Sequence, residues 1–314
     1  MKDLRIIFFG TPDFAVASLK AMVETGFNIV AVVTAIDKPA GRGHKMQSPP
    51  VKIYAESEKI PCLQPSNLKD AQFIQELKSF EANIQVVVAF RMLPEVAWNM
   101  PEHGTYNVHA SLLPAYRGAA PINWAIINGE KTTGVTTFKL KHEIDTGNIL
   151  LQREISIDEM DNAGSLHDKL MLAGANILID SLALLSEGKA ELQPQIRPTE
   201  AKVAPKIFKS DCAINWNLTV IDAHNFVRGM SPFPTAFAAI NLPDGQTENW
   251  KIYQSKPSSI KSQNIGRWSV IDNELFVSCS DYLLQITELQ SPGKRRMTAD
   301  EFIRGLRLDL SMIS

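Results

Sequence analysis

The sequence predicts an α/β fold with a Rossmann-like, mostly parallel sheet, followed by a small OB-like β domain. In the first half, short apolar runs alternate with helical segments, which is the pattern of a parallel sheet covered by helices. In the C-terminal third, short strand-like runs are separated by turn residues. The chain of 314 residues is also longer than one hydrophobic core usually supports, so two domains are expected.

The first predicted strand is the apolar run 4–9, which is interrupted only by Arg5. Residues 11–13 then supply an N-cap, a first-turn proline and an early acid, so a helix is expected until Gly26. This turn is a poor dinucleotide site because the Gly-x-Gly-x-x-Gly spacing is missing and Pro12 lacks a backbone donor. A nicotinamide cofactor is therefore not expected.

Three more strands are expected at residues 29–34, 84–90 and 105–108, and the valines of the second are expected to be buried on both faces. A sheet of this kind binds ligands beyond the carboxyl ends of its strands. Asn107 and His109 lie at such an end, and strand alternation directs both side chains to the same face. They are thus expected to converge on one ligand atom.

Asp145 follows His109 in a turn between the strand-like runs 134–140 and 149–155. An amide, an imidazole and a carboxylate are the groups needed to hold a tetrahedral oxyanion and to remove a proton from an attacking amine. Taken singly, Asn107 and His109 are ordinary polar groups near a sheet edge, and Asp145 is an ordinary turn residue. Their combination indicates acyl transfer.

The second half begins with Ser165 and Asp168, which predict a capped helix that ends at Gly188. Residues 189–207 are polar and contain three prolines, which is the composition of an extended linker. Strand-like runs at 250–253, 268–271, 275–279 and 282–289 then predict a small antiparallel barrel, and residues 298–301 predict a capped final helix. The expected domains are residues 1–188 and 208–314, joined by the linker.

The net charge of −2 excludes a whole-molecule attraction to nucleic acid, so such a partner would need local basic patches. Two candidate patches exist, each of which is otherwise ordinary solvated surface. One is a glycine- and proline-rich loop and the other lies near the C-terminus; their basic residues are Lys38, Arg42, His44 and Lys45, and Lys294, Arg295 and Arg296.

The three cysteines, Cys62, Cys212 and Cys279, have neither zinc-site spacing nor the density of a disulfide framework, so they are expected to be small buried hydrophobes. No metal is expected. No apolar run approaches the roughly 18 residues needed to cross a membrane, and the N-terminus lacks a secretory core. These observations predict a cytoplasmic enzyme.

Three motifs resemble the folate-dependent formyltransferase family. They are Asn-Val-His-Ala-Ser-Leu-Leu-Pro at 107–114, Arg-Gly-Ala-Ala-Pro-Ile at 117–122 and Asp-Thr-Gly at 145–147. The opening Gly-Thr-Pro-Asp-Phe-Ala at 10–15 and the loop at 37–43 resemble the branch of the family that uses tRNA. The resemblance extends from about residue 4 to the end, densely before residue 155 and sparsely after it.

The resemblance implies transfer of the formyl group of 10-formyltetrahydrofolate to the α-amine of initiator methionyl-tRNA, with Asn107, His109 and Asp145 as the catalytic residues. It implies that the C-terminal barrel and both basic patches bind tRNA, through Lys38, Arg42, Lys45, Lys294, Arg295 and Arg296. The implied folate-binding residues are Ser111, Leu112, Leu113 and Pro114, with Phe90, Arg91, Met92 and Leu93 against the pterin.

One segment departs from the family pattern. Many relatives have a Tyr-Gly pair between the valine strand and the following Leu-Pro, where this chain has Phe90, Arg91 and Met92. Arg91 is expected either to reach toward the acidic tail of the folate or to point to solvent.

Three other functions share parts of this pattern. An amino-sugar formyltransferase would share the three catalytic residues and the folate but would lack the basic loop. A glycinamide transformylase would need only the first domain, and a non-catalytic tRNA-binding module would be expected to have lost a catalytic residue. The intact pattern favours the tRNA-using enzyme, and a monomer is expected.

Overall fold

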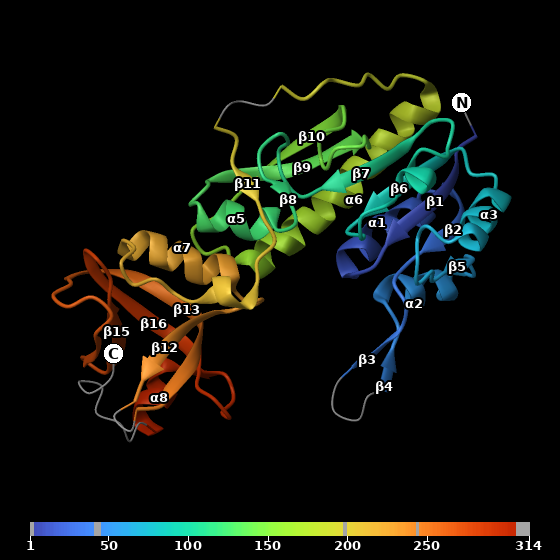
Figure 1. The fold of residues 1–314 in the computed structure, drawn as a ribbon. Coiled ribbons are helices and arrows are strands. Elements are labelled where there is room, and N and C mark those ends of the chain that lie inside the picture. Colours follow the sequence, from blue (N-terminus) through green and yellow to red (C-terminus); the bar gives the residue numbers. More distant parts are fainter. Residues whose placement is uncertain (1–2, 41–44, 197–199, 243–244, 306–314) are drawn as a thin grey trace. The chain divides into compact units, whose positions relative to one another are not determined.

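The computed structural model describes residues 3–40, 45–196, 200–242 and 245–305 (Figure 1). The chain divides into two compact units. The first unit comprises Met1–Arg117, Thr132–Ser156 and His167–Lys202. The second comprises Gly118–Lys131, Ile157–Leu166 and Val203–Ser314, so two of its segments are inserted between segments of the first unit.

The first unit is built on a seven-stranded sheet in the order β10-β9-β7-β6-β1-β2-β5. The five strands from β7 to β5 are parallel, whereas β9 and β10 are antiparallel additions at one edge. The sheet strands are β1 (Arg5–Gly10), β2 (Asn28–Val33), β5 (Cys62–Leu63), β6 (Ile84–Val88), β7 (Thr105–His109), β9 (Thr132–Lys139) and β10 (Ile149–Ser156). This is the mostly parallel α/β sheet that the sequence predicts.

Helices cover both faces of this sheet. One face packs Ile7 and Val87 against Phe73 and Leu77. On the other, Gly174 of α6 approaches Val108 of β7 closely enough that a Cβ there would lie 3.2 Å from its methyl carbon. The helices of the unit are α1 (Asp13–Glu24), α2 (Pro50–Ser57), α3 (Ala71–Ser79), α4 (Glu95–Trp98) and most of α6 (Ala163–Glu187). The strands β3 (Lys38–Ala40) and β4 (Lys45–Gln47) form a separate two-stranded sheet.

Two predicted helix starts are wrong by a few residues. Pro12 is itself the N-cap of α1 and makes no side-chain cap bond, so the helix begins at Asp13. The long helix α6 begins before Ser165: the Asn162 side chain accepts from the Ser165 amide at 2.9 Å, and the Ser165 hydroxyl accepts from the Asn162 amide at 3.0 Å. Asparagine is as good an N-cap as serine, so this reciprocal pair starts the helix three residues earlier.

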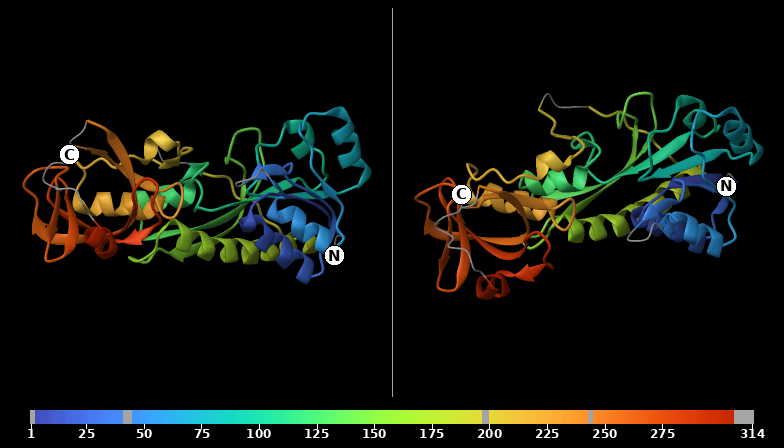
Figure 2. Two further views of the ribbon diagram at one scale, coloured as in Figure 1. Left: turned by 90° about the horizontal axis from the view of Figure 1, so that it is seen from below. Right: turned by 60° about the horizontal axis from the view of Figure 1, so that its bottom comes forward.

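The helix α6, the long yellow-green helix in Figure 2, is long and apolar enough to cross a membrane by length and composition. Its apolar face is nevertheless occupied within the protein. Half of the most apolar window is buried, and residues such as Leu170, Ile177 and Leu178 are almost inaccessible to solvent. The helix thus packs as the core helix of a globular unit.

The second unit contains the predicted antiparallel β domain. Its main sheet has the order β12-β13-β16-β15-β14, with β17 paired to β16. The strands are β12 (Ala236–Asn241), β13 (Thr247–Lys261), β14 (Trp268–Ile271), β15 (Glu274–Ser278), β16 (Tyr282–Gln290) and β17 (Met297–Thr298). The four strand-like runs of the sequence correspond to β13–β16, although β13 is much longer than predicted because it pairs with both β12 and β16.

The mostly aliphatic core of this unit contains a cluster of three aromatic rings. Trp250 packs edge-to-face on Trp268 and on Phe302, at centroid distances of 5.6 and 4.9 Å. Phe302 belongs to α8 (Ala299–Gly305), whose cap is the predicted one: Thr298 and Glu301 exchange side-chain to backbone bonds. Cys212 and Cys279 are buried free thiols, as predicted, whereas Cys62 in the first unit is only half-buried.

The segment 118–131 joins the second unit through α5 (Pro121–Ile127), which packs on α7 (Val220–Met230). Asn123 of α5 donates to the carbonyl oxygen of Gly229 at 2.8 Å. A Cβ at Gly229 would lie 2.6 Å from Ile127, so only glycine permits this approach. The remaining elements are β8 (Arg117–Gly118), β11 (Val203–Ala204) and a 3-10 turn, η1 (Lys209–Cys212).

Candidate active site

Asn107 and His109 lie where the sequence places them, on one face at the carboxyl end of β7. In the sheet, Asn107 is the register partner of Val87 in β6 and of Phe138 in β9, and His109 pairs with Thr136. Asn107 is partly exposed and His109 is buried. Strand β9 ends at Lys139, opposite Tyr106 near the start of β7, so the loop between β9 and β10 folds back to place Asp145 beside His109.

His109 contacts two groups through its two ring nitrogens. Nε2 lies 2.9 Å from the carbonyl oxygen of Tyr116, and Nδ1 lies 4.0 Å from Oδ2 of Asp145. A carbonyl oxygen only accepts, so Nε2 carries a proton and donates it to Tyr116. Nδ1 faces Asp145 at a distance greater than that of a direct hydrogen bond. The side chains of His109 and Asp145 are only 8% and 12% exposed, so solvent screens their interaction weakly.

The turn that carries Asp145 has a constrained backbone. Asp145 has φ of +54°, in the left-handed region that aspartate tolerates better than most residues. At Gly147 the turn crosses close to the backbone of Lys139, and a Cβ at Gly147 would lie only 1.7 Å from the carbonyl oxygen of Lys139. Thr146 closes the turn by donating to the carbonyl oxygen of Glu143 at 3.0 Å. The loop therefore holds one conformation that presents the Asp145 carboxylate to His109.

A residue that sequence reasoning missed also touches this turn. The Nε2 atom of Gln195 donates to the carbonyl oxygens of Asp145 at 2.9 Å and of Gly147 at 2.7 Å, while its Oε1 accepts two bonds from Arg117. Gln195 lies in the predicted linker, fifty residues from Asp145. No periodicity or motif in the sequence relates the two residues.

The segment from Ser111 to Pro114 is fixed by its neighbours in the sheet. Thr136 donates to the carbonyl oxygen of Ser111 at 2.6 Å and accepts from the Leu113 amide at 3.1 Å. The Ser111 hydroxyl is buried and donates to the carbonyl oxygen of Ala115. Leu113 is buried as well, so Leu112 and Pro114 are the members of this predicted folate wall that keep exposed surface.

The segment from Phe90 to Leu93 connects β6 to α4. Phe90 packs edge-to-face on Phe9, and Leu93 is buried, while Met92 is 72% exposed. The Arg91 guanidinium donates to the carbonyl oxygens of Pro65 and Ser66. Arg91 is thus exposed to solvent, as one alternative predicted, and its side chain also ties this segment to the loop before α3.

The first basic patch surrounds the β3–β4 hairpin. Lys38 is exposed in β3, Arg42 and His44 lie outside the described residues, and Lys45 is described only by its backbone in β4. The base of the hairpin is held by Asp37, which accepts from Lys52 at 2.8 Å and from Gln64 at 2.7 Å. These bonds lower the pKa of Asp37, the bond from Lys52 most.

The second patch is partly neutralised. Arg295 pairs with Glu301 at 2.6 Å, and Arg296 donates to Glu288 at 2.6 Å while its guanidinium lies 4.3 Å from the ring centroid of Tyr253. The bond to Glu288 raises the pKa of Arg296. Lys294 is exposed. The charge that this patch presents is therefore smaller than its sequence indicates.

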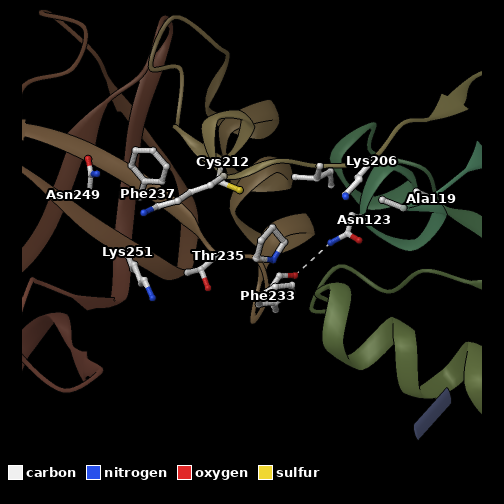
Figure 3. A pocket seen from close by; sticks show the side chains of 13 residues that line it. Ala119, Asn123, Lys206, Cys212, Phe233, Thr235, Phe237, Asn249 and Lys251 are labelled. Carbon is white, nitrogen blue, oxygen red and sulfur yellow. Dashed lines mark hydrogen bonds between the residues drawn. The ribbon is translucent and has the colours of Figure 1, made fainter. Parts of the chain in front are cut away.

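The second unit holds a pocket of about 620 Å³ that the sequence did not indicate (Figure 3). Its lining combines three lysines, Lys206, Lys209 and Lys251, with amides and aromatic rings. In Figure 3, Lys206 and Lys251 lie on opposite sides, and Phe233, which is 80% exposed, lies between them. Cations and exposed rings together suit a ligand with phosphates and flat bases.

Two family profiles match almost the whole chain. The one described as "Formyl transferase" matches residues 4–182, and the one described as "Formyl transferase, C-terminal domain" matches residues 206–307. The chain belongs to the formyltransferase family. The predicted family and enzyme class are therefore confirmed.

Relatives in this family align with nearly the whole chain. A methionyl-tRNA formyltransferase of Bacteroides fragilis is 49% identical over 313 residues, which cover 98% of this chain and 96% of the relative. One of Flavobacterium johnsoniae is 46% identical over 308 residues, with 98% and 97% covered.

Solved structures of formyltransferases share the fold. The sugar 3N-formyl transferase WlaRD, solved with dTDP and 5-N-formyl-THF, has a TM-score of 0.67 at 20% identity, covering 94% of this chain and all of that one. HypX from Aquifex aeolicus with tetrahydrofolic acid has a TM-score of 0.65 at 16% identity, covering 96% of this chain and 47% of that one. Within the described residues of this formyltransferase, no group of three or more His, Cys, Asp or Glu side chains is arranged to hold a metal ion.

Proposed function

We propose that this formyltransferase transfers the formyl group of 10-formyltetrahydrofolate to the α-amine of initiator methionyl-tRNA. The observation that carries the proposal is the 49% identity, over nearly the full length of both chains, to a methionyl-tRNA formyltransferase. The similarity includes the C-terminal domain, as a tRNA-using enzyme requires. The enzyme then acts in translation initiation in the cytoplasm, as a monomer.

The catalytic residues in this proposal are Asn107, His109 and Asp145. The amine attacks the formyl carbon, and the formyl oxygen becomes negative in the tetrahedral intermediate. Asn107 and His109 donate hydrogen bonds to that oxygen, each contributing on the order of 3 kcal/mol to the transition state. Because Nε2 of His109 already donates to Tyr116, the donation to the oxygen comes from Nδ1.

Donation from both nitrogens requires the imidazolium form of His109. Asp145 stabilises that charge, because its carboxylate lies 4.0 Å from Nδ1 in a nearly buried position. The gap also suits a water molecule or a substrate group between the two side chains. Asp145 accepts the proton of the attacking amine, directly or through that water. When the intermediate collapses, the bond between the formyl carbon and N10 of the folate breaks, and N10 takes the proton back from Asp145.

The attacking amine must be neutral. A free α-amine titrates at about 7.7–8, and its ester to tRNA titrates lower, so a large neutral fraction exists near pH 7. The chemistry therefore needs proton acceptance and oxyanion stabilisation and no metal.

The folate binds between two segments in this proposal. Phe90, Arg91, Met92 and Leu93 lie against the pterin, and Ser111, Leu112, Leu113 and Pro114 form the wall beside the formyl group. The exposed side chain of Met92 supports an apolar contact with the pterin. The side chains of Ser111 and Leu113 are buried, which supports a structural role for them.

The tRNA partner binds through local basic surfaces, with residues 1–188 as the catalytic domain, 189–207 as the linker and 208–314 as the tRNA-binding domain. Lys38, Arg42, Lys45 and Lys294 contribute cations, and Arg295 and Arg296 contribute less because glutamates pair with them. The pocket of the second unit adds Lys206, Lys209 and Lys251, together with an exposed ring for stacking.

The experiment that tests this function follows a labelled formyl group. Purified protein and labelled 10-formyltetrahydrofolate are incubated with charged initiator tRNA, charged elongator tRNA or an amino-sugar nucleotide. Label on the initiator methionyl-tRNA is the expected result. Label on the amino sugar alone would replace the proposal with a sugar N-formyltransferase.

A further inference from the structure

The side chain of Gln195 uses its whole hydrogen-bonding capacity to join two segments of the site. An amide group has two donor hydrogens and two acceptor lone pairs. Both hydrogens go to the Asp145 turn, at the carbonyl oxygens of Asp145 and Gly147. The oxygen accepts from Nε and Nη2 of Arg117, at 3.1 and 2.6 Å. No other uncharged side chain of similar length offers two donors and two acceptors at one end.

The backbone around Gln195 is held independently of its side chain. Two residues earlier, Gln193 exchanges both backbone hydrogen bonds with Ile149, each at 2.8 Å. Ile149 begins β10 directly after the Asp145 turn. The linker backbone is thus tied to the sheet at this point, so binding of the Gln195 side chain does not also have to order the backbone.

Arg117 connects Gln195 to the histidine of the site. Arg117 follows Tyr116, whose carbonyl oxygen accepts from Nε2 of His109, and whose backbone amide donates to Lys202 at 2.7 Å. A closed circuit of contacts results, from Asp145 through Gln195, Arg117 and Tyr116 to His109 and back to Asp145 across 4.0 Å. Every member of this circuit lies within the first unit.

Without the two hydrogen bonds from Gln195, which we call the Gln195 clamp, the Asp145 turn is expected to change its conformation. Asp145 sits at φ of +54°, a conformation that costs free energy in a residue with a Cβ and persists where the surroundings impose it. Two of the hydrogen bonds that impose it come from Gln195. Loss of both would remove two of the bonds that hold the turn and let the carboxylate move relative to His109.

We infer that Gln195 is a positioning residue for the formyl transfer. From its place in the linker, it sets the distance between the side chains of Asp145 and His109. The inference rests on the proposed function of those two residues. A misplacement of about 1 Å in a catalytic group can lower a rate by about 100-fold. The expected effect of losing the clamp is a fall in kcat of about 10- to 100-fold, with the KM for each substrate changed less than about threefold.

The decisive variant is Gln195→Glu. It keeps the size of the side chain and the acceptor for Arg117, but it replaces both donors with an acceptor that faces two carbonyl oxygens. The matched control is Gln193→Glu, the same change at an exposed side chain two residues away. Gln195→Leu removes all four bonds without adding charge and covers the case in which the glutamate variant folds poorly.

The measurements are kcat and KM for formyl transfer, the pH profile of kcat, and the thermal unfolding temperature. A lowered kcat and an altered pH profile in either Gln195 variant, with Gln193→Glu at the wild-type rate and unfolding temperatures unchanged, is the expected result. A kcat within twofold of wild type in both Gln195 variants would overturn the inference. A fall in kcat that merely follows a fall in unfolding temperature would overturn it too.

Asp145→Asn, measured beside them, separates this inference from the proposed function. If Asp145→Asn is slow and the Gln195 variants are fast, only the positioning role is wrong. If Asp145→Asn transfers formyl groups at the normal rate, the assignment of the site is wrong and the positioning role is wrong with it.

Discussion

Nδ1 of His109 lies 4.0 Å from Oδ2 of Asp145, while Nε2 of the same ring donates to the carbonyl oxygen of Tyr116. The bond to Tyr116 determines which ring nitrogen can interact with Asp145. With one nitrogen committed to the backbone, the other is the only one that faces the carboxylate and the space beside it. The ring is thereby oriented by a main-chain atom, which substitution of the Tyr116 side chain would not remove.

Asp145→Asn and His109→Ala should each lower kcat by about 100- to 10,000-fold, because each removes a group that moves or stabilises charge in the transition state. Folate binding, followed by fluorescence titration, should remain measurable, since neither residue is assigned to the cofactor. A near-normal turnover in either variant would remove its assigned role.

Replacement of Arg42 and Lys45 by alanine should weaken tRNA binding and flatten its dependence on salt. Each phosphate contact that is lost should reduce the slope of log K against log salt by about 0.7–0.9. Lys78→Ala, at an exposed lysine in α3, is the control. An unchanged slope in the double variant would mean that the hairpin loop is ordinary solvated surface.

The pocket of the second unit makes a separate prediction. Alanine at Lys206 and Lys251 should raise the KM for methionyl-tRNA about 10-fold and reduce the salt slope by about one or two, because both ammonium groups line the cavity. The KM for the folate should not change. Wild-type tRNA kinetics in this double variant would exclude the pocket from the tRNA path.

Stability should depend on pH through His224. Burial lowers the pKa of His224 to about 4, and Arg228 contributes; the ring lies 3.0 Å from the Ser255 hydroxyl. In the unfolded chain His224 is therefore protonated below about pH 6.5, whereas in the folded chain it is protonated only below about pH 4. The contribution of His224 to the free energy of unfolding is fully present above pH 6.5. It falls by on the order of 2–3 kcal/mol toward pH 4 and is constant below that.

Urea unfolding followed by tryptophan fluorescence at several pH values checks this dependence. His224→Gln should flatten the decline between pH 6.5 and 4. His142→Gln is the control, because its side chain is 84% exposed. If the free energy of unfolding has the same dependence on pH in the wild type and both variants, His224 is not the cause of that dependence.

The sequence predicted the parts of the site that depend on local pattern. Strand alternation placed Asn107 and His109 on one face, and turn residues placed Asp145 between two strands, both as found. The valines of β6 are buried on both faces because helices cover both sides of the sheet. Each of these features depends on residues close together in the chain, where periodicity and turn chemistry are informative.

The contacts that were missed join distant segments. Gln195 meets Asp145 only because the linker pairs with Ile149, and a polar linker composition predicts extended chain without a partner. Likewise, α5 belongs to the second unit through its packing on Gly229, a contact between residues about a hundred positions apart. Arg91 is exposed, as one of its two expected positions required, but its bonds to the backbone of a neighbouring loop were not predicted. Such pairings follow from tertiary packing, which one sequence does not display.

The crossing at Gly147 has a consequence for inherited variation. Every amino-acid substitution at this codon adds at least a Cβ atom, and that atom would overlap the carbonyl oxygen of Lys139. No missense change is conservative there, including the change to alanine. Natural variants of the enzyme should therefore keep this glycine while neighbouring surface positions drift, and only the third position of its codon, where every change is silent, should vary freely.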